Sequence, residues 1–250
     1  REVPDMKRIL DHRLQGGQAA LWFLGQAGYV ARSGDVTLTI DPYLTDSIAK
    51  SAPEFSRIVP PPFEPEDLRV DIFLVTHDHA DHLDAETIGR YRHANDTTFV
   101  APRFACRKLR ELGLPDERLV RLDAGETISL PGVSVSAAFA LPTGKDVLDT
   151  VGYLLTFTNG RSLYHASDTA YCDLLLEAAP SAEVLLVPIN GKWGNLNVEQ
   201  ALALTRKVNP RFVQPNHYDL MALNAENPET FRYFCETWGI DARCVIPQIM

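Results

Sequence analysis

The sequence contains few cysteines, and they lie far apart. Four occur among 250 residues and no two of them form a C-x-x-C pair; they are Cys106, Cys172, Cys235 and Cys244. This spacing argues against a zinc ribbon and against a redox dithiol. We expect the four side chains to be small buried hydrophobes in a reducing compartment, which predicts a cytoplasmic protein.

Long apolar runs and an excess of positive charge are also absent. No stretch reaches the ~20 apolar residues that a membrane span needs, and the first five residues lack the charged-then-apolar pattern of a signal peptide. The 33 acidic residues outnumber the 24 lysines and arginines, for a net charge of -9. This balance argues against nucleic acid or a membrane as a partner. We therefore expect a small-molecule substrate, and the sequence leaves a homo-oligomer open.

The order of the strand and helix patterns indicates an α/β fold. Residues 20–25, 28–32 and 36–41 predict a meander, the apolar run 71–75 predicts a buried strand, and residues 126–165 are β-rich. Further helices are expected at 84–92, 103–112, 173–179, 198–208 and 227–238, and further strands at 97–101, 118–122, 183–188, 210–214 and 241–246. Two β-rich stretches, each followed by helices, predict a single domain built as a sandwich of two mixed β-sheets flanked by helices.

Two segments fall outside this alternation. Residues 4–14 carry apolar side chains at helical spacing, which predicts a short amphipathic helix before the first strand. Residues 44–67 are rich in proline and serine and predict an irregular loop. Because a loop of this length in a compact domain is more often functional than accidental, we expect it to form one wall of a pocket.

The strongest chemical signal is the segment Thr76-His77-Asp78-His79-Ala80-Asp81-His82, which follows the buried strand. Three of the chain's seven histidines fall within six residues, which a solvated polar loop would not explain. His77 and His79 are two apart, so their rings point the same way along an extended segment. Imidazole and carboxylate together suit Zn, Mn or Fe rather than Ca. The segment therefore predicts a metal site at the edge of a sheet.

This His-x-His-x-Asp-His motif after an apolar strand resembles the signature of the metallo-β-lactamase superfamily. The resemblance implies that superfamily's αββα sandwich. Other segments resemble the branch that contains the L-ascorbate-6-phosphate lactonases; they are Trp22–Gly28, Ile40–Pro42, His165–Thr169, 188–201 and Pro215–Asp219. The resemblance thus extends through most of the chain.

The resemblance also implies one or two divalent metal ions, Mn or Zn with Fe as a further option, in two adjacent positions that share Asp168. His77 and His79 would serve the first position. Asp81, His82 and His217 would serve the second. These assignments are compatible with the expected elements, because the His motif, Asp168 and His217 each follow a predicted strand and can converge on one edge.

The chain departs from the superfamily pattern before and beside Asp168. The superfamily usually supplies a third His to the first position, but residues 138–146 contain none. Asp146 or a water would have to replace it, so the second position is expected to be the tighter or the only occupied one. Ser167 stands where the family usually has Gly. His165 is expected to orient a ligand rather than to bind the ion, and Asp41 is either a hydrogen-bond acceptor for a ligand His or a simple turn residue.

The implied chemistry is hydrolysis. Water bound to such an ion has its pKa lowered toward ~7, so we expect metal-bound hydroxide, oriented by Asp81, to attack a carbonyl or phosphorus centre. The branch resemblance favours the lactone of a small sugar acid, with or without a phosphate. The alternatives are a phosphodiesterase on the same metal centre and a non-catalytic metal-binding protein with a degraded first site.

Three loops are expected to set the specificity: 44–67, 139–150 and 189–197. The last of these is polar and rich in glycine, so it is either part of the substrate pocket or a surface loop. Lys145 and Arg206 are candidate partners for an anionic substrate, although ordinary solvated charges explain them better.

Overall fold

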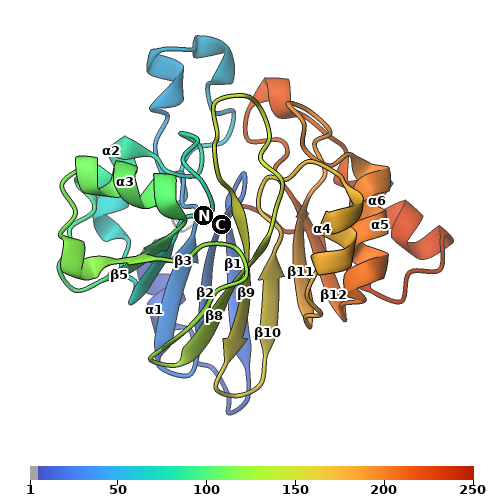
Figure 1. Cartoon of the computed structure of the whole chain (residues 1–250), viewed down its shortest axis with the longest axis horizontal. Helices are drawn as coiled ribbons and strands as arrows, with labels where there is room; N and C mark the ends of the chain where they lie inside the picture. The colour runs from blue at the N-terminus through green and yellow to red at the C-terminus, as the bar shows by residue number, and fades with distance from the viewer. Residues whose placement is uncertain (1–4) are drawn as a thin grey trace.

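Two β-sheets face each other in the computed structural model, which describes residues 5–250 (Figure 1). The first sheet has six strands in chain order. They are β1 (Ala19–Gly25), β2 (Gly28–Ser33), β3 (Val36–Ile40), β4 (Ile72–Leu74), β5 (Thr98–Ala101) and β6 (Leu119–Arg121). The strands β1 to β3 pair antiparallel, and β3 to β6 pair parallel.

The second sheet repeats this plan with seven strands. They are β7 (Thr127–Leu130), β8 (Val133–Phe139), β9 (Val151–Phe157), β10 (Ser162–His165), β11 (Val184–Pro188), β12 (Phe212–Asn216) and β13 (Arg243–Cys244). The strands β7 to β10 pair antiparallel, and β10 to β13 pair parallel. Each sheet thus begins as a meander and ends as a parallel array.

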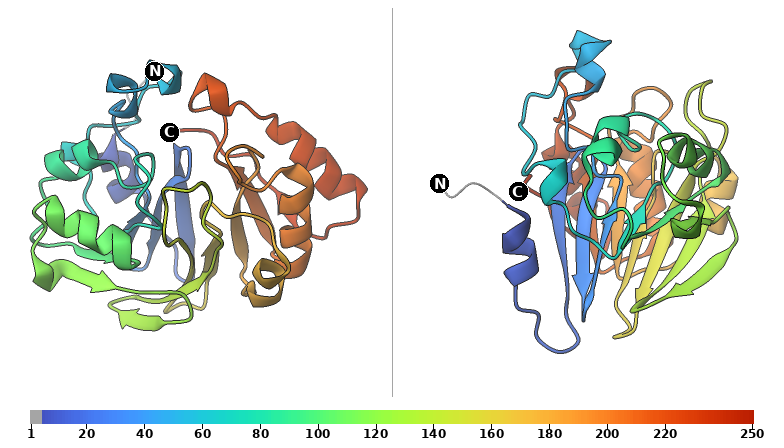
Figure 2. Two further views of the ribbon diagram at one scale, coloured as in Figure 1. Left: turned by 45° about the horizontal axis from the view of Figure 1, so that its top comes forward. Right: turned by 90° about the vertical axis from the view of Figure 1, so that its left-hand side faces the viewer.

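Helices cover the outer face of each sheet (Figure 2). The first sheet is covered by α1 (Met6–Asp11), α2 (Ala85–Arg90) and α3 (Arg103–Glu111), and the second by α4 (Asp173–Ala178), α5 (Val198–Val208) and α6 (Pro228–Thr237). Five short 3-10 helices lie in the connections: η1 (Ile48–Lys50), η2 (Pro53–Phe55), η3 (Pro65–Asp67), η4 (Asp116–Arg118) and η5 (Ala222–Asn224). None of the helices in residues 5–250 is both long and apolar enough to span a membrane.

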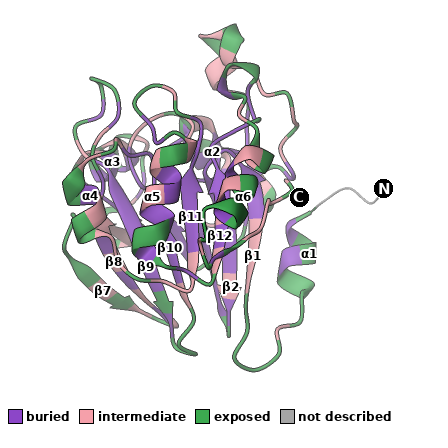
Figure 3. Cartoon of the chain, turned by 90° about the vertical axis from the view of Figure 1, so that its right-hand side faces the viewer, coloured by how far each residue is buried: buried purple, intermediate pink, exposed green. Residues whose placement is uncertain are grey.

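Apolar side chains fill the space between the sheets, where the strands are mostly buried (Figure 3). In β8, Val133 and Val135 are buried, whereas Ser134 and Ser136 between them are partly exposed. Burial of a valine-sized side chain contributes about 1.5–3 kcal/mol, so this alternation determines which face of β8 lies inward. Tyr153 of β9 crosses the layer, and its hydroxyl donates a hydrogen bond to the Val75 carbonyl at 2.8 Å.

The predicted sandwich of two mixed sheets flanked by helices is confirmed. The predicted lead-in helix forms as α1, and residue 4 of its expected range lies outside the described residues. The strand expected over 241–246 is shorter, because β13 ends at Cys244 and Pro247, which has no N–H, follows soon after.

The cysteines differ in part from expectation. All four are free, but only Cys106 and Cys235 are buried, whereas Cys172 and Cys244 are partly exposed. Cys244 lies at the end of the short edge strand β13, and Cys172 precedes α4, so both pack against the margin of a core cluster and stay partly exposed. The expectation of four buried cysteines therefore holds for two of them.

Candidate metal centre

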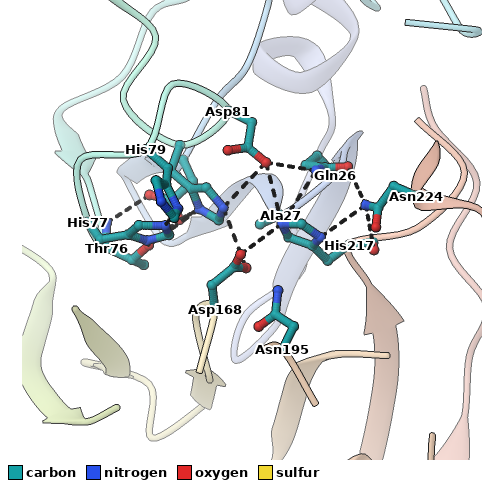
Figure 4. A network of polar contacts seen from close by, with 12 residues as sticks. Gln26, Ala27, Thr76, His77, His79, Asp81, Asp168, Asn195, His217 and Asn224 are labelled. Carbon is teal, nitrogen blue, oxygen red and sulfur yellow. Dashed lines mark hydrogen bonds and ion pairs between the residues drawn. The ribbon is translucent and has the colours of Figure 1, made fainter. Parts of the chain in front are cut away.

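Loops from both sheets converge at one end of the sandwich. In the first sheet, Asp41 follows β3 and the segment His77–His82 follows β4; in the second sheet, Asp168 follows β10 and His217 follows β12. Parallel strands place their carboxyl ends at the same edge of a sheet. Side chains that are far apart in the sequence therefore meet at this end (Figure 4).

Two imidazoles and two carboxylates form the inner part of this site, which we name the buried cluster: Asp81, His82, Asp168 and His217. His217 Nε2 lies 3.0 Å from Asp168 Oδ2 and 3.4 Å from Asp81 Oδ2. His82 Nε2 lies 3.4 Å from Asp168 Oδ1 and 3.7 Å from Asp81 Oδ2. Asp81 and Asp168 lie on opposite sides of the His217 ring in this view (Figure 4). Four of the six predicted ligands are thus brought together.

Unpaired buried atoms indicate what the buried cluster binds. Among the described residues, His82 Nε2 and Asp168 Oδ1 are buried and have no hydrogen-bond partner. Leaving a polar atom in this state costs about 1–3 kcal/mol, and a cation between the two atoms would remove that cost. Imidazole nitrogens and carboxylate oxygens are ligands of Zn and of similar divalent ions. The residues present therefore fit a divalent metal ion.

Asp41 orients His82 within the buried cluster. Its Oδ2 lies 2.7 Å from His82 Nδ1 and accepts a hydrogen bond from the Thr76 hydroxyl at 2.6 Å, and its Oδ1 accepts one from the Thr76 backbone N–H at 2.8 Å. When His82 Nδ1 carries the proton, the Nε2 lone pair faces the metal position. Asp41 has a φ of +45°, a conformation that few non-glycine residues adopt. The hydrogen-bond role left open by the sequence is therefore the one seen in the structure.

Gln26 and Asn224 hold His217, and sequence reasoning missed both. The Asn224 amide lies 3.0 Å from His217 Nδ1 and donates to the His217 carbonyl at 2.9 Å. Gln26 Nε2 donates to Asp81 Oδ2 at 2.8 Å. Gln26 belongs to the segment Trp22–Gly28 that resembles the lactonase branch, which was a usable signal. Asn224 stands in a 3-10 helix outside every motif, and the sequence carries no signal for it.

His77 and His79 occupy different places at the site: His77 is buried, whereas His79 is partly exposed on its outer side. One oxygen of Asp168 and one ring nitrogen each of His77 and His82 lie within 4.8 Å of one another, so His77 lies beside the buried cluster. His79 belongs to neither ligand group found among the described residues. Its Nδ1 lies 2.9 Å from His77 Nε2 and its Nε2 lies 3.4 Å from Asp146 Oδ1. The structure thus groups His77 with His82 and Asp168, where the resemblance groups His77 with His79.

Residues 138–146, which contain no histidine, contribute Asp146 to the outer side of the site. The Asp146 side chain is 76% exposed, so solvent screens its interaction with His79. Beside Asp168, Ser167 has a φ of +65°. This left-handed conformation is the one that glycine adopts without strain, which explains why glycine is usual at this position of the family. Here a serine accepts the strain, and its hydroxyl lies 3.0 Å from the Thr150 hydroxyl.

His165 supports the turn that carries Asp168. The Ser167 backbone N–H donates to His165 Nδ1 at 3.0 Å, so the ring proton lies on Nε2 and donates to the Ala27 carbonyl at 2.9 Å. Burial lowers the pKa of His165, which favours this neutral form. Both ring nitrogens are occupied, so His165 fixes the position of a neighbouring turn and is not itself a ligand.

The opposite charges in the buried cluster stabilise one another and shift the pKa values of its groups. Burial by itself raises the pKa of a carboxyl group, but the charges of His82 and His217 outweigh it and hold the pKa of Asp81 well below its ordinary value. The same balance, with His217 as the larger contributor, keeps the pKa of Asp168 low. Burial lowers the pKa of His217, yet Asp168 and Asp81 raise it to about 9. At neutral pH the cluster therefore offers two ionised carboxylates to a cation.

A cavity of about 440 Å³ opens onto the buried cluster, and it is lined in part by all three predicted specificity loops. Segment 44–67 contributes Phe55, segment 139–150 contributes Thr143 and Asp146, and segment 189–197 contributes Trp193 and Asn195. The prediction that 44–67 forms one wall of a pocket is confirmed. Lys145 and Arg206 are not part of this lining, which agrees with their interpretation as solvated charges.

Known proteins match this chain over the range that contains these residues. A family model described as "Beta-lactamase superfamily domain" matches residues 37–218, a range that contains all six predicted ligands. A UPF0173 metal-dependent hydrolase of Thermoplasma acidophilum is 30% identical over 226 residues, which cover 86% of this chain and 90% of that protein. The chain therefore belongs to the metallo-β-lactamase superfamily and, within it, to the UPF0173 metal-dependent hydrolases.

Solved structures show the same fold at lower identity. Igni18, a metallo hydrolase from Ignicoccus hospitalis, has a TM-score of 0.73 and 23% identity, with 92% of this chain and 96% of that chain covered. An isothiocyanate hydrolase from Delia radicum gut bacteria has a TM-score of 0.74 and 18% identity, with 93% and 97% covered. These likenesses concern the fold alone, and the expected membership in the lactonase branch stays a prediction.

Proposed function

We propose that this metal-dependent hydrolase opens the ring of a lactone or cleaves a similar carboxylic ester. The observation that supports this most is the buried cluster, in which His82 Nε2 and Asp168 Oδ1 are buried without a partner. Three of its residues, Asp81, Asp168 and His217, line a cavity of substrate size. A divalent ion held there would supply a Lewis acid for the carbonyl and would lower the pKa of a water toward ~7.

Asp81 is the residue best placed to orient the attacking water. It lines the cavity, and the Gln26 amide fixes its Oδ2 at 2.8 Å. Because its pKa is held below the ordinary value, Asp81 is a carboxylate at neutral pH and can accept a hydrogen bond from water. A carboxylate with so low a pKa is a weak base, so its role is to aim the water rather than to retain the proton.

Direct attack by water agrees with the rest of the cavity. Among the described residues, no serine or cysteine lines it, and Thr143 is its one hydroxyl side chain. A covalent acyl-enzyme would need such a nucleophile beside a base. We therefore expect hydrolysis in a single displacement, with no burst of product at the start of the reaction.

Chelation and metal reconstitution test this proposal. The chelated protein is reloaded with Mn, Zn or Fe(II), its metal content is measured, and it is assayed on a panel of lactones, on phenyl esters and on bis-p-nitrophenyl phosphate. We expect ring opening with at least one metal and none in the chelated form. Full lactone turnover without metal would contradict the proposal.

The same panel separates the alternatives. Phosphodiester cleavage without lactone cleavage would identify the second candidate, a phosphodiesterase. A protein that retains no ion after reconstitution and hydrolyses nothing would fit the degraded site. An isothiocyanate belongs in the panel because water also attacks its central carbon, and because a protein of the same fold is an isothiocyanate hydrolase.

A further inference from the structure

The cavity over the buried cluster combines a polar inner end with an apolar lining. The inner end carries the metal-centre residues, including Asp81, Asp168 and His217. The apolar lining comes from segments distant in the sequence: Ile48, Ala52 and Phe55 of segment 44–67, Trp193 of segment 189–197, and Met221. The rings of Phe55 and Trp193 lie 5.7 Å apart, inclined at 51°. Such a pair provides a surface for a flat or branched apolar group.

Trp193 is held in this position by its backbone. It is the second residue of a turn in which the Asn195 N–H donates to the Lys192 carbonyl at 2.9 Å, and both Trp193 and Gly194 have positive φ, +51° and +94°. This conformation is strained for a bulky residue, so it persists only where the surroundings fix it. The Asn195 side chain does so, because its Oδ1 accepts a hydrogen bond from the Thr169 N–H, next to Asp168, at 2.9 Å.

The large apolar side chain of Trp193 is thereby held at the cavity. Trp193 is 51% exposed although most indole surface in a folded protein is buried. Its turn is tied on one side to the loop of the metal-centre residue Asp168. On the other side Lys192 Nζ donates to the Leu223 and Ala225 carbonyls at 2.7 and 3.1 Å. The loop therefore places the Trp193 ring at the cavity, whereas its lysine, Lys192, is paired with backbone carbonyls.

Away from the metal centre, the lining offers no lysine or arginine from residues 5–250 to a charged substrate. Asp146 lines it and adds a negative charge on the outer side. A phosphate or carboxylate bound away from the metal would lose its hydration without gaining a lysine or arginine partner, which is unfavourable, whereas the burial of an apolar group is favourable. The lining thus disfavours an anionic substituent and favours an uncharged one.

We propose that the substrate is an uncharged ester or lactone with an aromatic or branched aliphatic substituent, and that Phe55 and Trp193 determine this specificity by packing against the substituent. The bond that is cleaved rests on the proposed function, whereas the binding preference rests on the cavity lining. The phosphorylated sugar acid that the resemblance allows would be a poor ligand for this lining.

Binding of a pair of non-hydrolysable analogues tests the preference. The metal-loaded protein is titrated by calorimetry with a phenylethyl-substituted γ-lactam and with the same lactam carrying a phosphate on its side chain. We expect the uncharged lactam to bind at least tenfold more tightly. We expect Trp193→Ala and Phe55→Ala each to weaken its binding by roughly tenfold, as for other truncations in apolar pockets, and Trp193→Phe to retain most of it.

A matched control variant and an assay of hydrolysis distinguish failure of this inference from failure of the proposed function. Trp238→Ala removes an aromatic ring that is 45% exposed but lies outside the cavity, and should leave binding unchanged. Metal content and Tm are measured for every variant, so that a loss of fold is recognised. Tighter binding of the phosphorylated lactam, or equal binding by the wild type and both alanine variants, would overturn the inference even if lactones are hydrolysed. Selective binding of the uncharged lactam without hydrolysis of any lactone or ester would overturn the proposed function alone.

Discussion

Two histidines of the segment His77–His82, His82 and His79, are held in different ways. His82 is fully buried, and its Nδ1 is paired with Asp41, which two hydrogen bonds from Thr76 hold in place. The His79 side chain is 28% exposed and faces Asp146, a surface carboxylate. Buried, mutually fixed ligands need no reordering when an ion binds, whereas exposed ones do. The comparison teaches that one part of the site is preorganised and that the other part must be ordered by the ion.

Of the changes that test this comparison, removal of a buried imidazole should have the largest effect on metal affinity. We expect His82→Ala and His217→Ala each to lower the affinity for the tight ion by at least roughly a hundredfold and to abolish activity, because no other side chain can replace the lost ligand. Equilibrium dialysis with Zn or Mn measures the loss. His93→Ala, outside the site, serves as the control. Wild-type affinity in either variant would show that the tight ion binds elsewhere.

Loss of the carboxylate behind His82 should have the next largest effect. Asp41→Asn keeps the shape of the side chain but removes the charge that fixes the His82 ring. We expect metal affinity to fall by roughly 10- to 100-fold. The free energy of unfolding of the chelated protein should change less. Asp71→Asn is the matched control, because Asp71 also accepts a backbone hydrogen bond, from Thr37, but outside the site. If Asp71→Asn lowers metal affinity as much as Asp41→Asn, the orienting role of Asp41 is wrong.

The pH dependence of metal binding should show a smaller, graded effect. In the metal-free protein the pKa of His217 is raised to about 9, so the ring is protonated at pH 7 and must release its proton to become a ligand. Apparent affinity should therefore rise with pH up to about 9, by roughly tenfold per unit for each proton released. Calorimetry in buffers of different ionisation enthalpy counts that proton. Binding without proton release at pH 7 would show that His217 stays protonated and is not a ligand.

Changes on the outer side should have the smallest effect on the tight ion. We expect His79→Ala and Asp146→Asn to leave its affinity within about fivefold, because an exposed charge pair contributes at most about 1 kcal/mol. A second metal equivalent, if the wild type binds one, should be weakened more strongly. Titration with two equivalents of Co²⁺, followed by its absorption spectrum, separates the two steps. A loss of the first step in Asp146→Asn would place the tight ion on the outer side instead.

The sequence predicted the sandwich and the convergence of the ligand segments because both depend on local patterns. Apolar periodicity determines strands and helices, and the carboxyl ends of parallel strands must lie on one edge. The helix predicted over 198–208 has the same bounds as α5, whose N-cap is Asn197. The same reasoning left Asp41 undecided, because its role depends on its distance from His82 Nδ1, 41 positions away in the chain.

Other features of the site are invisible in a single sequence for the same reason. Gln26 and Asn224 are 198 positions apart, yet their side chains meet at 3.2 Å beside His217. Phe55 and Trp193 form one surface from two loops whose conformations no periodic pattern describes. The grouping of His77 with His82 and Asp168 also follows from ring orientation rather than from spacing along the motif. Loops and side-chain amides obey no short repeat, and only the folded chain shows which of them are neighbours.

The buried cluster draws Asp81 and His82 from one sheet and Asp168 and His217 from the other. An ion bound there is therefore a cross-link between the two halves of the sandwich as well as a reagent. Since it binds only the assembled pair of sheets, it should stabilise the fold by about 2.7 kcal/mol at a free concentration one hundred times its dissociation constant. Cells that are short of the metal would then hold a protein that is both inactive and more easily degraded, so that metal supply would control its abundance together with its activity.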